Sequence, residues 1–239
     1  MKITRNIFRR LITKIYLTVI VKTCSQKFIF RYVYHFNLWG NNESRSGDGS
    51  TLKYTENIRK DLPILFEKYG IKTILDAPCG DFNWFNEILK KSSIEVTGID
   101  IVPAIVKKNN KKYRNNKKVN FLQKNLVTYK YKPYDLVFCR DFLFHLSFND
   151  TYKFLENFIN SNSKFLLTTS HSNVLSHSDI ASGLFRYTDL FQAPYFFHFE
   201  DNERIKDFAG PDRERYLFLF SRTQVIHALT NQADFFKEK

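Results

Sequence analysis

The sequence predicts a doubly wound α/β domain built around a mostly parallel sheet. Apolar runs and helical segments alternate between residues 71 and 170, and continuous apolar strands separated by helices are typical of a parallel sheet covered on both faces. The first of these runs ends in an acid, turns at a glycine and leads into a helix-compatible segment. Because such sheets bind ligands at the carboxyl ends of their strands, we expect the functional residues there.

Length and composition set the outer bounds. The chain has 239 residues, enough for one domain with additions. Its net charge of +13 would suit nucleic acid, a phosphorylated substrate or an anionic membrane, although a compositional bias toward Lys, Asn, Ile and Phe also explains it. Cys24, Cys79 and Cys139 lack CxxC spacing. They argue against a disulfide framework or a zinc site and for a reducing, cytoplasmic compartment, and we predict no metal.

Residues 1–50 are predicted to form a basic amphipathic helix followed by a loop. Apolar residues recur every four positions, at Ile3, Ile7, Leu11, Ile15 and Val19, and basic residues occupy the other faces, at Lys2, Arg5, Arg9, Arg10 and Lys14. The longest uncharged stretch, residues 15–21, is far shorter than the roughly 18 residues that a membrane span requires. Two interpretations stay open for residues 2–21. The helix contacts the inner face of a membrane peripherally, or it packs on the main domain.

The next segments lead into the core. Residues 27–39 are rich in aromatic side chains but show no clear period, so no structure is assigned to them. Residues 41–50 read as a loop, either a linker or a lid that brings Arg45 to a carboxylate or phosphate. Residues 51–69 are predicted to be a helix that ends at Gly70.

The core strands end in polar residues. We expect strands at about 72–76, 95–99, 119–122, 134–139 and 164–169, and helices at about 83–91, 102–113 and 149–160. Asp76 ends the first strand, with Gly80 four residues later, where a glycine lets the backbone approach a ligand. Asp100 ends the second strand, roughly 20 residues beyond the turn, where an acid can accept hydrogen bonds from ribose hydroxyls.

The third and fourth strands add candidate ligand contacts. After the third strand, a polar side chain among residues 120–125 could address an adenine amino group while Leu126 packs on the ring. Arg140, Asp141 and His145 follow the fourth strand and fall on the active-site side.

These motifs resemble those of the class I S-adenosylmethionine-dependent methyltransferases. The acid-and-glycine turn matches Asp76–Asp81, the ribose acid matches Asp100, and the fourth-strand motif matches Asp135–His145. Ser44–Ser50, Asp76–Trp84 and Cys139–Asp141 resemble a bacterial-type subgroup more narrowly. The resemblance implies a Rossmann-like, mostly parallel seven-stranded sheet with an antiparallel last strand near residues 216–220. It also implies a methyltransferase domain over residues 51–239 and S-adenosyl-L-methionine as the cofactor.

The resemblance also implies a set of cofactor-binding residues. These are Asp76, Ala77, Pro78, Cys79, Gly80, Asp81, Trp84, Asp100, Ile101, Asn125, Leu126, Arg140 and, from the loop, Arg45. The turn departs from the family's pattern by keeping a single glycine, and Asn125 stands where an acid is frequent. The single glycine argues against NAD, whose turn uses three.

The expected reaction is methyl transfer to oxygen. Asp141 and His145 are the candidate general bases, and we expect a sugar, glycan or other small hydroxylated metabolite as the acceptor. Residues 171–215 are predicted to be a substrate-facing insertion with the aromatic residues 194–199 as pocket walls, the alternative being a structural flap. Residues 221–239 read as a polar tail.

Two other functions remain open. An RNA methyltransferase is favoured by the charge and by the lysine-rich stretch 107–118, although nucleic acid is the less expected partner. A membrane-associated α/β binding module without catalysis is the second, and retention of Asp76, Gly80 and Asp100 argues against it.

Overall fold

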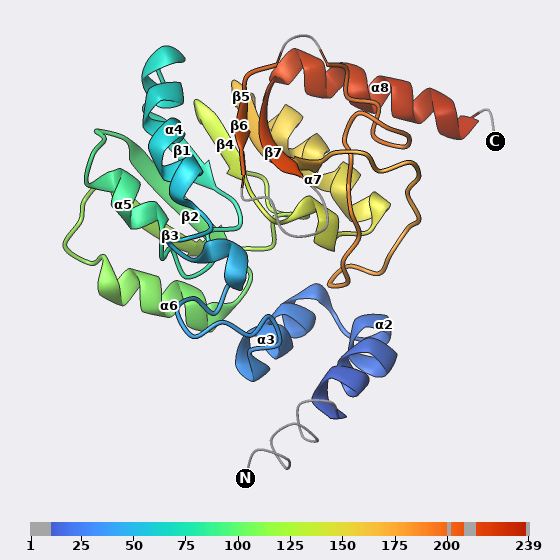
Figure 1. The fold of residues 1–239 in the computed structure, drawn as a ribbon, viewed down its shortest axis with the longest axis horizontal. Coiled ribbons are helices and arrows are strands. Elements are labelled where there is room, and N and C mark those ends of the chain that lie inside the picture. The colour runs from blue at the N-terminus through green and yellow to red at the C-terminus, as the bar shows by residue number, and fades with distance from the viewer. Residues whose placement is uncertain (1–10, 200–201, 208–213, 238–239) are drawn as a thin grey trace.

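The computed structural model describes residues 11–199, 202–207 and 214–237, which fold around a seven-stranded sheet with helices on both faces (Figure 1). The strands are β1 (Thr73–Asp76), β2 (Glu95–Asp100), β3 (Val119–Gln123), β4 (Leu136–Cys139), β5 (Phe165–His171), β6 (Arg204–Lys206) and β7 (Arg215–Ser221). The five strands predicted between residues 71 and 170 are all present, within about two residues of their expected bounds.

The strand order confirms the predicted fold class. The sheet runs β3-β2-β1-β4-β5-β7-β6, and β7 lies antiparallel to both β5 and β6 while the other strands share one direction. The order reverses between β1 and β4, and such a switch point is where open α/β sheets bind ligands. The short β6 lies inside the predicted insertion and was not anticipated.

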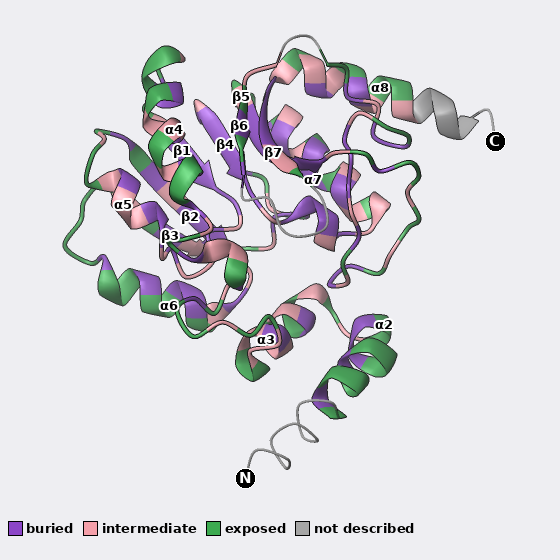
Figure 2. Ribbon diagram, in the orientation of Figure 1, coloured by how far each residue is buried: buried purple, intermediate pink, exposed green. Residues whose placement is uncertain are grey.

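Side-chain alternation explains how both faces are buried. Leu75 and Val137 point into one core, and their neighbours Ile74 and Phe138 point into the other, as the two-residue period of a strand requires. The first face is covered by α7 (Phe148–Asn160) and α8 (Arg222–Lys237), and the second by α4 (Glu56–Lys68), α5 (Phe85–Leu89) and α6 (Pro103–Lys112). Figure 2 shows the buried sheet between these layers.

Two helices differ from the prediction. α4 begins at residue 56 instead of 51, because residues 51–55 form turns. Most of the predicted polar tail is the helix α8, in which Val225 and Ala228 are buried against the core. Among the described side chains Leu229 packs beside them, and three neighbouring apolar residues are too weak a signal for a helical period in the sequence.

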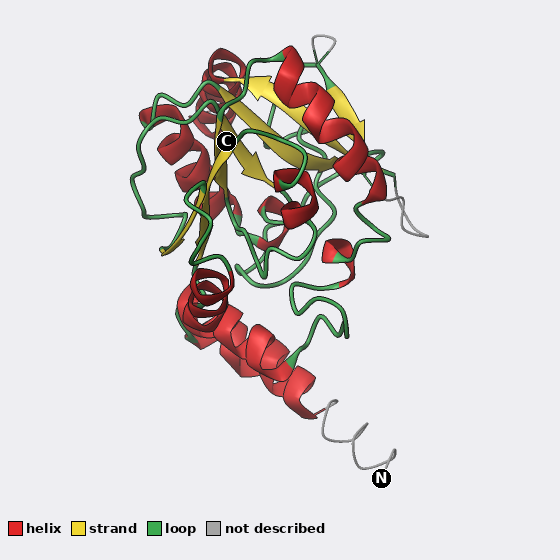
Figure 3. Ribbon diagram, turned by 90° about the vertical axis from the view of Figure 1, so that its left-hand side faces the viewer, coloured by secondary structure: helices red, strands yellow, loops and turns green. Residues whose placement is uncertain are grey.

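The N-terminal residues form a helical extension that projects from the sheet domain (Figure 3). Residues 11–15 are helical and continue through the π-helical turn η1 (Tyr16–Ile20) and α2 (Val21–Thr23); α3 (Gln26–Phe36) then folds back. Ser25 caps α3, accepting a hydrogen bond from the Phe28 amide, and Asn37 ends it in the left-handed conformation.

The extension packs through a different face from the one that the four-residue period predicted. Ile12, Tyr16 and Ile20 are buried, whereas the predicted apolar positions Leu11, Ile15 and Val19 are exposed. The other residues of that pattern, Ile3, Ile7, Lys2, Arg5, Arg9 and Arg10, lie outside the described residues. Within the described ranges, no helix is long and apolar enough to cross a membrane.

Candidate functional site

The turn after β1 is fixed by its neighbours on both sides. The Ala77 amide donates to the Phe138 carbonyl of β4 at 2.9 Å, and the Cys79 amide donates to the Ile99 carbonyl of β2 at 2.8 Å. Gly80 then adopts a left-handed backbone, with φ of +51°, which glycine adopts without strain. The turn is therefore held rigidly where the strand order reverses.

The loop at residues 44–50 lies directly over this turn. The Asp81 carboxylate accepts hydrogen bonds from the Ser44 hydroxyl and the Arg45 amide, and the Asp81 amide donates to the Ser46 hydroxyl at 3.0 Å. A β-carbon at Gly80 would lie 2.4 Å from the Ser46 oxygen. The glycine therefore provides space for the loop as well as the backbone conformation.

Two buried carboxyl groups face the turn. Asp100 accepts hydrogen bonds from the Gly80 amide at 3.2 Å and the Val102 amide at 2.8 Å. Burial raises the pKa of Asp100 to about 6. Burial and the nearby Asp100 also raise the pKa of Asp76 well above its ordinary value, against the opposing effect of Arg140. Both acids line the same cleft, where a ligand that offers donors or positive charge would stabilise their ionised forms.

The first cleft opens to solvent and encloses about 840 Å³ of space, including its open mouth. Eleven of the predicted site residues line it: Arg45, Asp76, Pro78, Cys79, Gly80, Trp84, Asp100, Ile101, Arg140, Asp141 and His145. Val102 and Ile105 complete an apolar wall beside Asp100.

Four predicted cofactor residues do not line the first cleft. Ala77 is fully buried, and Asp81 holds the loop. The Asn125 amide group donates to Gln26 at 2.8 Å and accepts from the Val127 amide at 3.0 Å, while Leu126 is buried in the core. The adenine contact assigned to Asn125 and Leu126 stays a prediction, since both side chains have other partners here.

The extension supplies cleft residues that the sequence did not reveal. Phe30 and Tyr34, one turn apart on α3, line the first cleft together with Trp39, Ser46 and Ser50. The four-residue spacing of the two aromatics was the available signal, but the surrounding aromatic residues hid it. The wall of the cleft therefore crosses the predicted boundary at residue 50.

Beside the cleft, two arginines and two aspartates form a closed ion-pair cluster. Arg140 binds Asp207 in bidentate fashion, at 3.0 and 2.9 Å, and contacts Asp141 at 3.2 Å. Arg215 contacts Asp141 at 3.1 Å and Asp207 at 3.2 Å. Burial acts to raise the pKa of Asp141, but the two guanidinium groups dominate and lower it. Asp141 is therefore ionised at neutral pH.

His145 is the last residue of the short helical turn η3 (Leu143–His145), and its contacts define the tautomer of its ring. Its Nδ1 lies 2.8 Å from the Leu184 carbonyl oxygen, which can only accept, so Nδ1 carries the proton and Nε2 has a free lone pair. Burial lowers the pKa of His145, so the ring is neutral at pH 7. Its ring stacks on Trp39, with centroids 5.1 Å apart.

A second cleft, which encloses about 970 Å³ including its open mouth, also borders His145. Polar residues, including Asp48, Tyr54 and Arg215, line it together with the aromatic residues Phe185 and Tyr187. Trp39, Ser46, Asp141 and His145 line both clefts. The two clefts therefore meet at the predicted catalytic pair.

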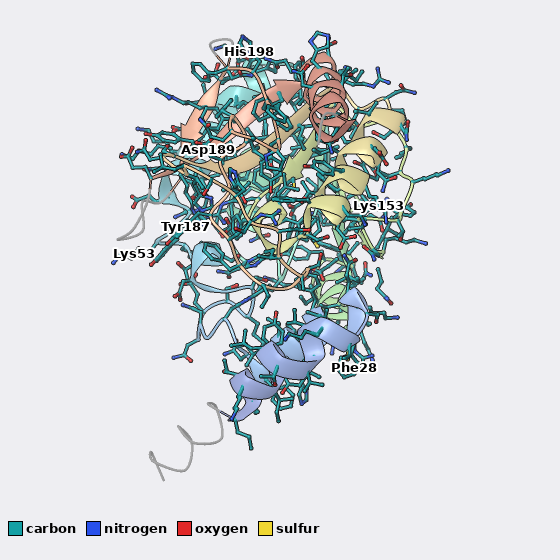
Figure 4. All side chains as sticks on the ribbon, turned by 90° about the vertical axis from the view of Figure 1, so that its right-hand side faces the viewer. Phe28, Lys53, Lys153, Tyr187, Asp189 and His198 are labelled. Atoms are coloured by element: carbon teal, nitrogen blue, oxygen red, sulfur yellow. The ribbon has the colours of Figure 1, made fainter. Side chains whose placement is uncertain are left out.

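The predicted insertion contributes to the second cleft through fewer aromatics than expected. Phe185 and Tyr187 line it, and Tyr187 is labelled in Figure 4. Tyr195 and Phe197, expected as pocket walls, are buried in the sheet core instead, so that part of the prediction was wrong. The sequence could not distinguish the two cases, because an aromatic cluster has the same residue types whether it lines a pocket or packs in the core. Among the described residues, no group of three or more His, Cys, Asp or Glu side chains is arranged to hold a metal.

Comparison with known proteins gives similarities in sequence and in fold. Residues 74–161 match the family model described as a methyltransferase domain. A search of curated proteins finds no match.

Several solved structures share the fold. Magnesium protoporphyrin IX methyltransferase from Synechocystis, with bound S-adenosylhomocysteine, superposes with a TM-score of 0.58 at 12% identity, covering 83% of this chain and 100% of that one. The 1,6-didemethyltoxoflavin N1-methyltransferase of Burkholderia thailandensis gives 0.56 at 16% identity, covering 82% and 86%. The N-methyltransferase NodS of Bradyrhizobium japonicum gives 0.55 at 10% identity, covering 80% and 97%.

Proposed function

We propose that this chain, whose residues 74–161 match a methyltransferase-domain model, is an S-adenosylmethionine-dependent methyltransferase that methylates a hydroxyl oxygen of a sugar, glycan or other small hydroxylated metabolite. The observation that carries the proposal is the meeting of two clefts at Asp141 and His145. A reaction between a donor in one cleft and an acceptor in the other would take place beside these side chains.

The first cleft fits the adenosyl half of the cofactor. Asp100 would accept hydrogen bonds from the ribose hydroxyls, and Val102 and Ile105 offer an apolar surface for the base. The bound cofactor supplies an electrophilic methyl group on a sulfonium. Trp39 and the loop at residues 44–50 would shield the reacting atoms from water.

His145 is the better placed of the two candidate bases. Its free Nε2 and its neutral ring let it remove a proton from an acceptor hydroxyl. Asp141, which lies between two guanidinium groups, is a weak base because those charges lower its pKa. We assign Asp141 to stabilising the imidazolium that forms when His145 takes up the proton.

The lining of the second cleft supports a small polar acceptor. Phe185 and Tyr187 provide flat apolar surface, and Asp48, Tyr54 and Arg215 provide hydrogen-bonding groups, the mixture that orients a hydroxylated ligand in a pocket. The RNA alternative rests on the lysine-rich stretch 107–118, which ends at Lys117 and Lys118, beyond the C-terminal end of α6. The N-terminal end of α6 is the one near the first cleft, so this placement favours the small acceptor.

The test is transfer of an isotopically labelled methyl group to a panel of monosaccharides, glycans and hydroxylated metabolites. We expect the label in an alkali-stable methyl ether, because methyl esters are hydrolysed by mild alkali. His145→Gln should slow transfer by about 10²–10⁴-fold while leaving cofactor affinity unchanged. His227→Gln, an exposed histidine on α8, is the matched control and should retain activity.

Three results would contradict the proposal. The first is label found only on nitrogen or in esters. The second is label on RNA, with transfer that falls steeply as salt rises. The third is a His145→Gln variant as active as the wild type, which would remove His145 from the reaction.

A further inference from the structure

Exposed apolar side chains gather on the helical extension. Of the twelve large hydrophobic residues that are exposed in the described part of the chain, seven lie between residues 11 and 39: Leu11, Ile15, Leu17, Val19, Phe28, Phe36 and Trp39. Leu11, Ile15 and Val19 are 53%, 37% and 48% exposed. Their four-residue spacing places them along one ridge of the helix, away from the packed residues Ile12, Tyr16 and Ile20.

The ridge is exposed even though the helix beneath it is firmly packed. Tyr16, Ile20 and Val33 belong to one buried cluster that joins the two arms of the extension. The Tyr16 hydroxyl donates to the Gly183 carbonyl, and Gln26 donates to Asp150 at 2.6 Å. Because the extension is tied to the main domain at both places, the exposed ridge is a defined outer face.

The same segment carries more than half of the net positive charge. Residues 1–42 contain eight Lys or Arg and no Asp or Glu, so they account for +8 of the chain's +13. Among the described residues, Lys14 and Lys22 lie on the first arm, and Lys27 and Arg31 lie on α3. All four side chains are exposed.

The outer surface of α3 combines basic and apolar side chains. Lys27, Arg31 and His35 lie there with the exposed ring of Phe28, along an open groove that reaches Pro103 at the start of α6. Figure 4 shows Phe28 on the outside of the extension, on the side away from the sheet. The combination of basic groups and protruding apolar side chains continues from one arm to the other.

We propose that this outer face of residues 11–36 docks on the surface of an anionic lipid bilayer. Apolar side chains such as Leu11 and Ile15 would enter the boundary between headgroups and acyl chains, and the basic residues would contact anionic headgroups. The charge argues against a second copy of the chain as the occupant, because two such faces repel each other. A nucleic acid would satisfy the charges and leave the apolar ridge in water. The inference does not depend on the proposed methyl acceptor.

The test uses the full chain and co-sedimentation with vesicles of phosphatidylcholine alone or mixed with phosphatidylglycerol. We expect binding to the mixed vesicles only, weakening as salt rises. Leu11→Ser/Ile15→Ser/Val19→Ser should lower the partition coefficient at least tenfold. Lys14→Glu/Lys22→Glu should lower it by at least roughly fivefold for each residue, as about 1 kcal/mol per basic residue converts.

Matched control variants distinguish docking through this face from a general effect of removing exposed apolar or basic side chains. Ile64→Ser/Leu175→Ser removes two apolar side chains that are 62% and 97% exposed on other parts of the molecule, and should bind vesicles like the wild type. Lys107→Glu/Lys108→Glu changes two lysines on α6 and is the charge control. An unchanged thermal unfolding midpoint in each variant shows that the fold is kept.

Three outcomes would overturn the proposal. The wild type does not bind the mixed vesicles, or the ridge variant binds them as well as the wild type does. In the third, the wild type is a dimer in solution that the ridge variant dissociates, which would assign the face to a second copy of the chain.

Discussion

Replacing Gly80 with alanine tests whether the loop at residues 44–50 forms a wall of the first cleft. The new β-carbon would lie 2.4 Å from the Ser46 oxygen and 3.1 Å from the Ser46 β-carbon, whereas an ordinary contact begins near 3.4 Å, so the Ser46 side chain must shift by about 1 Å and lose its place in the loop. The left-handed backbone adds about 1–2 kcal/mol of strain for any residue with a β-carbon. A displacement of that size can reduce function by up to about 10²-fold.

Gly70→Ala supplies the matched control. Gly70 has a similar backbone conformation, with φ of +61°, but no atom lies within 4 Å of the added β-carbon. We expect both variants to lose about 1–2 kcal/mol in the free energy of unfolding, measured by urea denaturation. Only Gly80→Ala should lose affinity for S-adenosylhomocysteine, by at least tenfold in calorimetry. Equal affinities for the two variants would refute the role given to the loop.

The remaining predictions concern the buried charges. Cofactor affinity should be full above about pH 6 and fall about tenfold per pH unit below it, because burial raises the pKa of Asp100 to about 6 and only the ionised carboxylate accepts both ribose hydroxyls; a flat calorimetric profile from about pH 5 to 8 would contradict this. In the ligand-free protein burial raises the pKa of Asp100 from its ordinary value of 3.8 to about 6, so this carboxyl should lower the free energy of unfolding by up to about 3 kcal/mol as pH rises from about 3.8 to about 6. Asp100→Asn should make that slope shallower in urea denaturation, and Asp76, whose pKa burial also raises, should keep part of it. Asp207→Ala should destabilise the protein by about 3–5 kcal/mol, because it removes a carboxylate from between Arg140 and Arg215 in a buried cluster. The exposed Lys206, paired with the exposed Glu214, is its control, and Lys206→Ala should change stability by under about 1 kcal/mol; equal losses in the two variants would refute the importance of the cluster.

The sequence predicted those parts of the site that depend on local pattern. Asp76 and Asp100 were found because an acid at a strand end is visible as soon as the apolar strand is recognised. Gly80 was found because a turn between strand and helix favours glycine. Each of these inferences needed only neighbouring residues and the rule that parallel strands end on one edge of the sheet.

The parts that were missed depend on contacts between distant segments. Phe30 and Tyr34 reach the first cleft only because the extension folds back across it. No pattern among neighbouring residues predicts that the chain folds back in this way. Asp207 holds Arg140 across 67 positions of sequence, so the ion-pair cluster could not be anticipated. Tyr195 was assigned to a pocket because an aromatic cluster in a loop has the same composition whether it faces a ligand or the core.

The assignment of His145 was limited in the same way. The sequence placed it beside Asp141 but left its tautomer open. The contact with the Leu184 carbonyl, 39 residues away, fixes that tautomer. A role in proton transfer therefore rests on a contact made by the predicted insertion.

The most direct test of the central claim is calorimetric titration of the full chain with S-adenosylmethionine, S-adenosylhomocysteine and NAD. We expect the two sulfur compounds to bind at one site per chain and NAD not to bind. In Asp100→Ala the affinity for both should fall at least tenfold, because the ribose hydroxyls lose their acceptor. Absence of binding by either sulfur compound, or an Asp100→Ala variant that binds them like the wild type, would contradict the account.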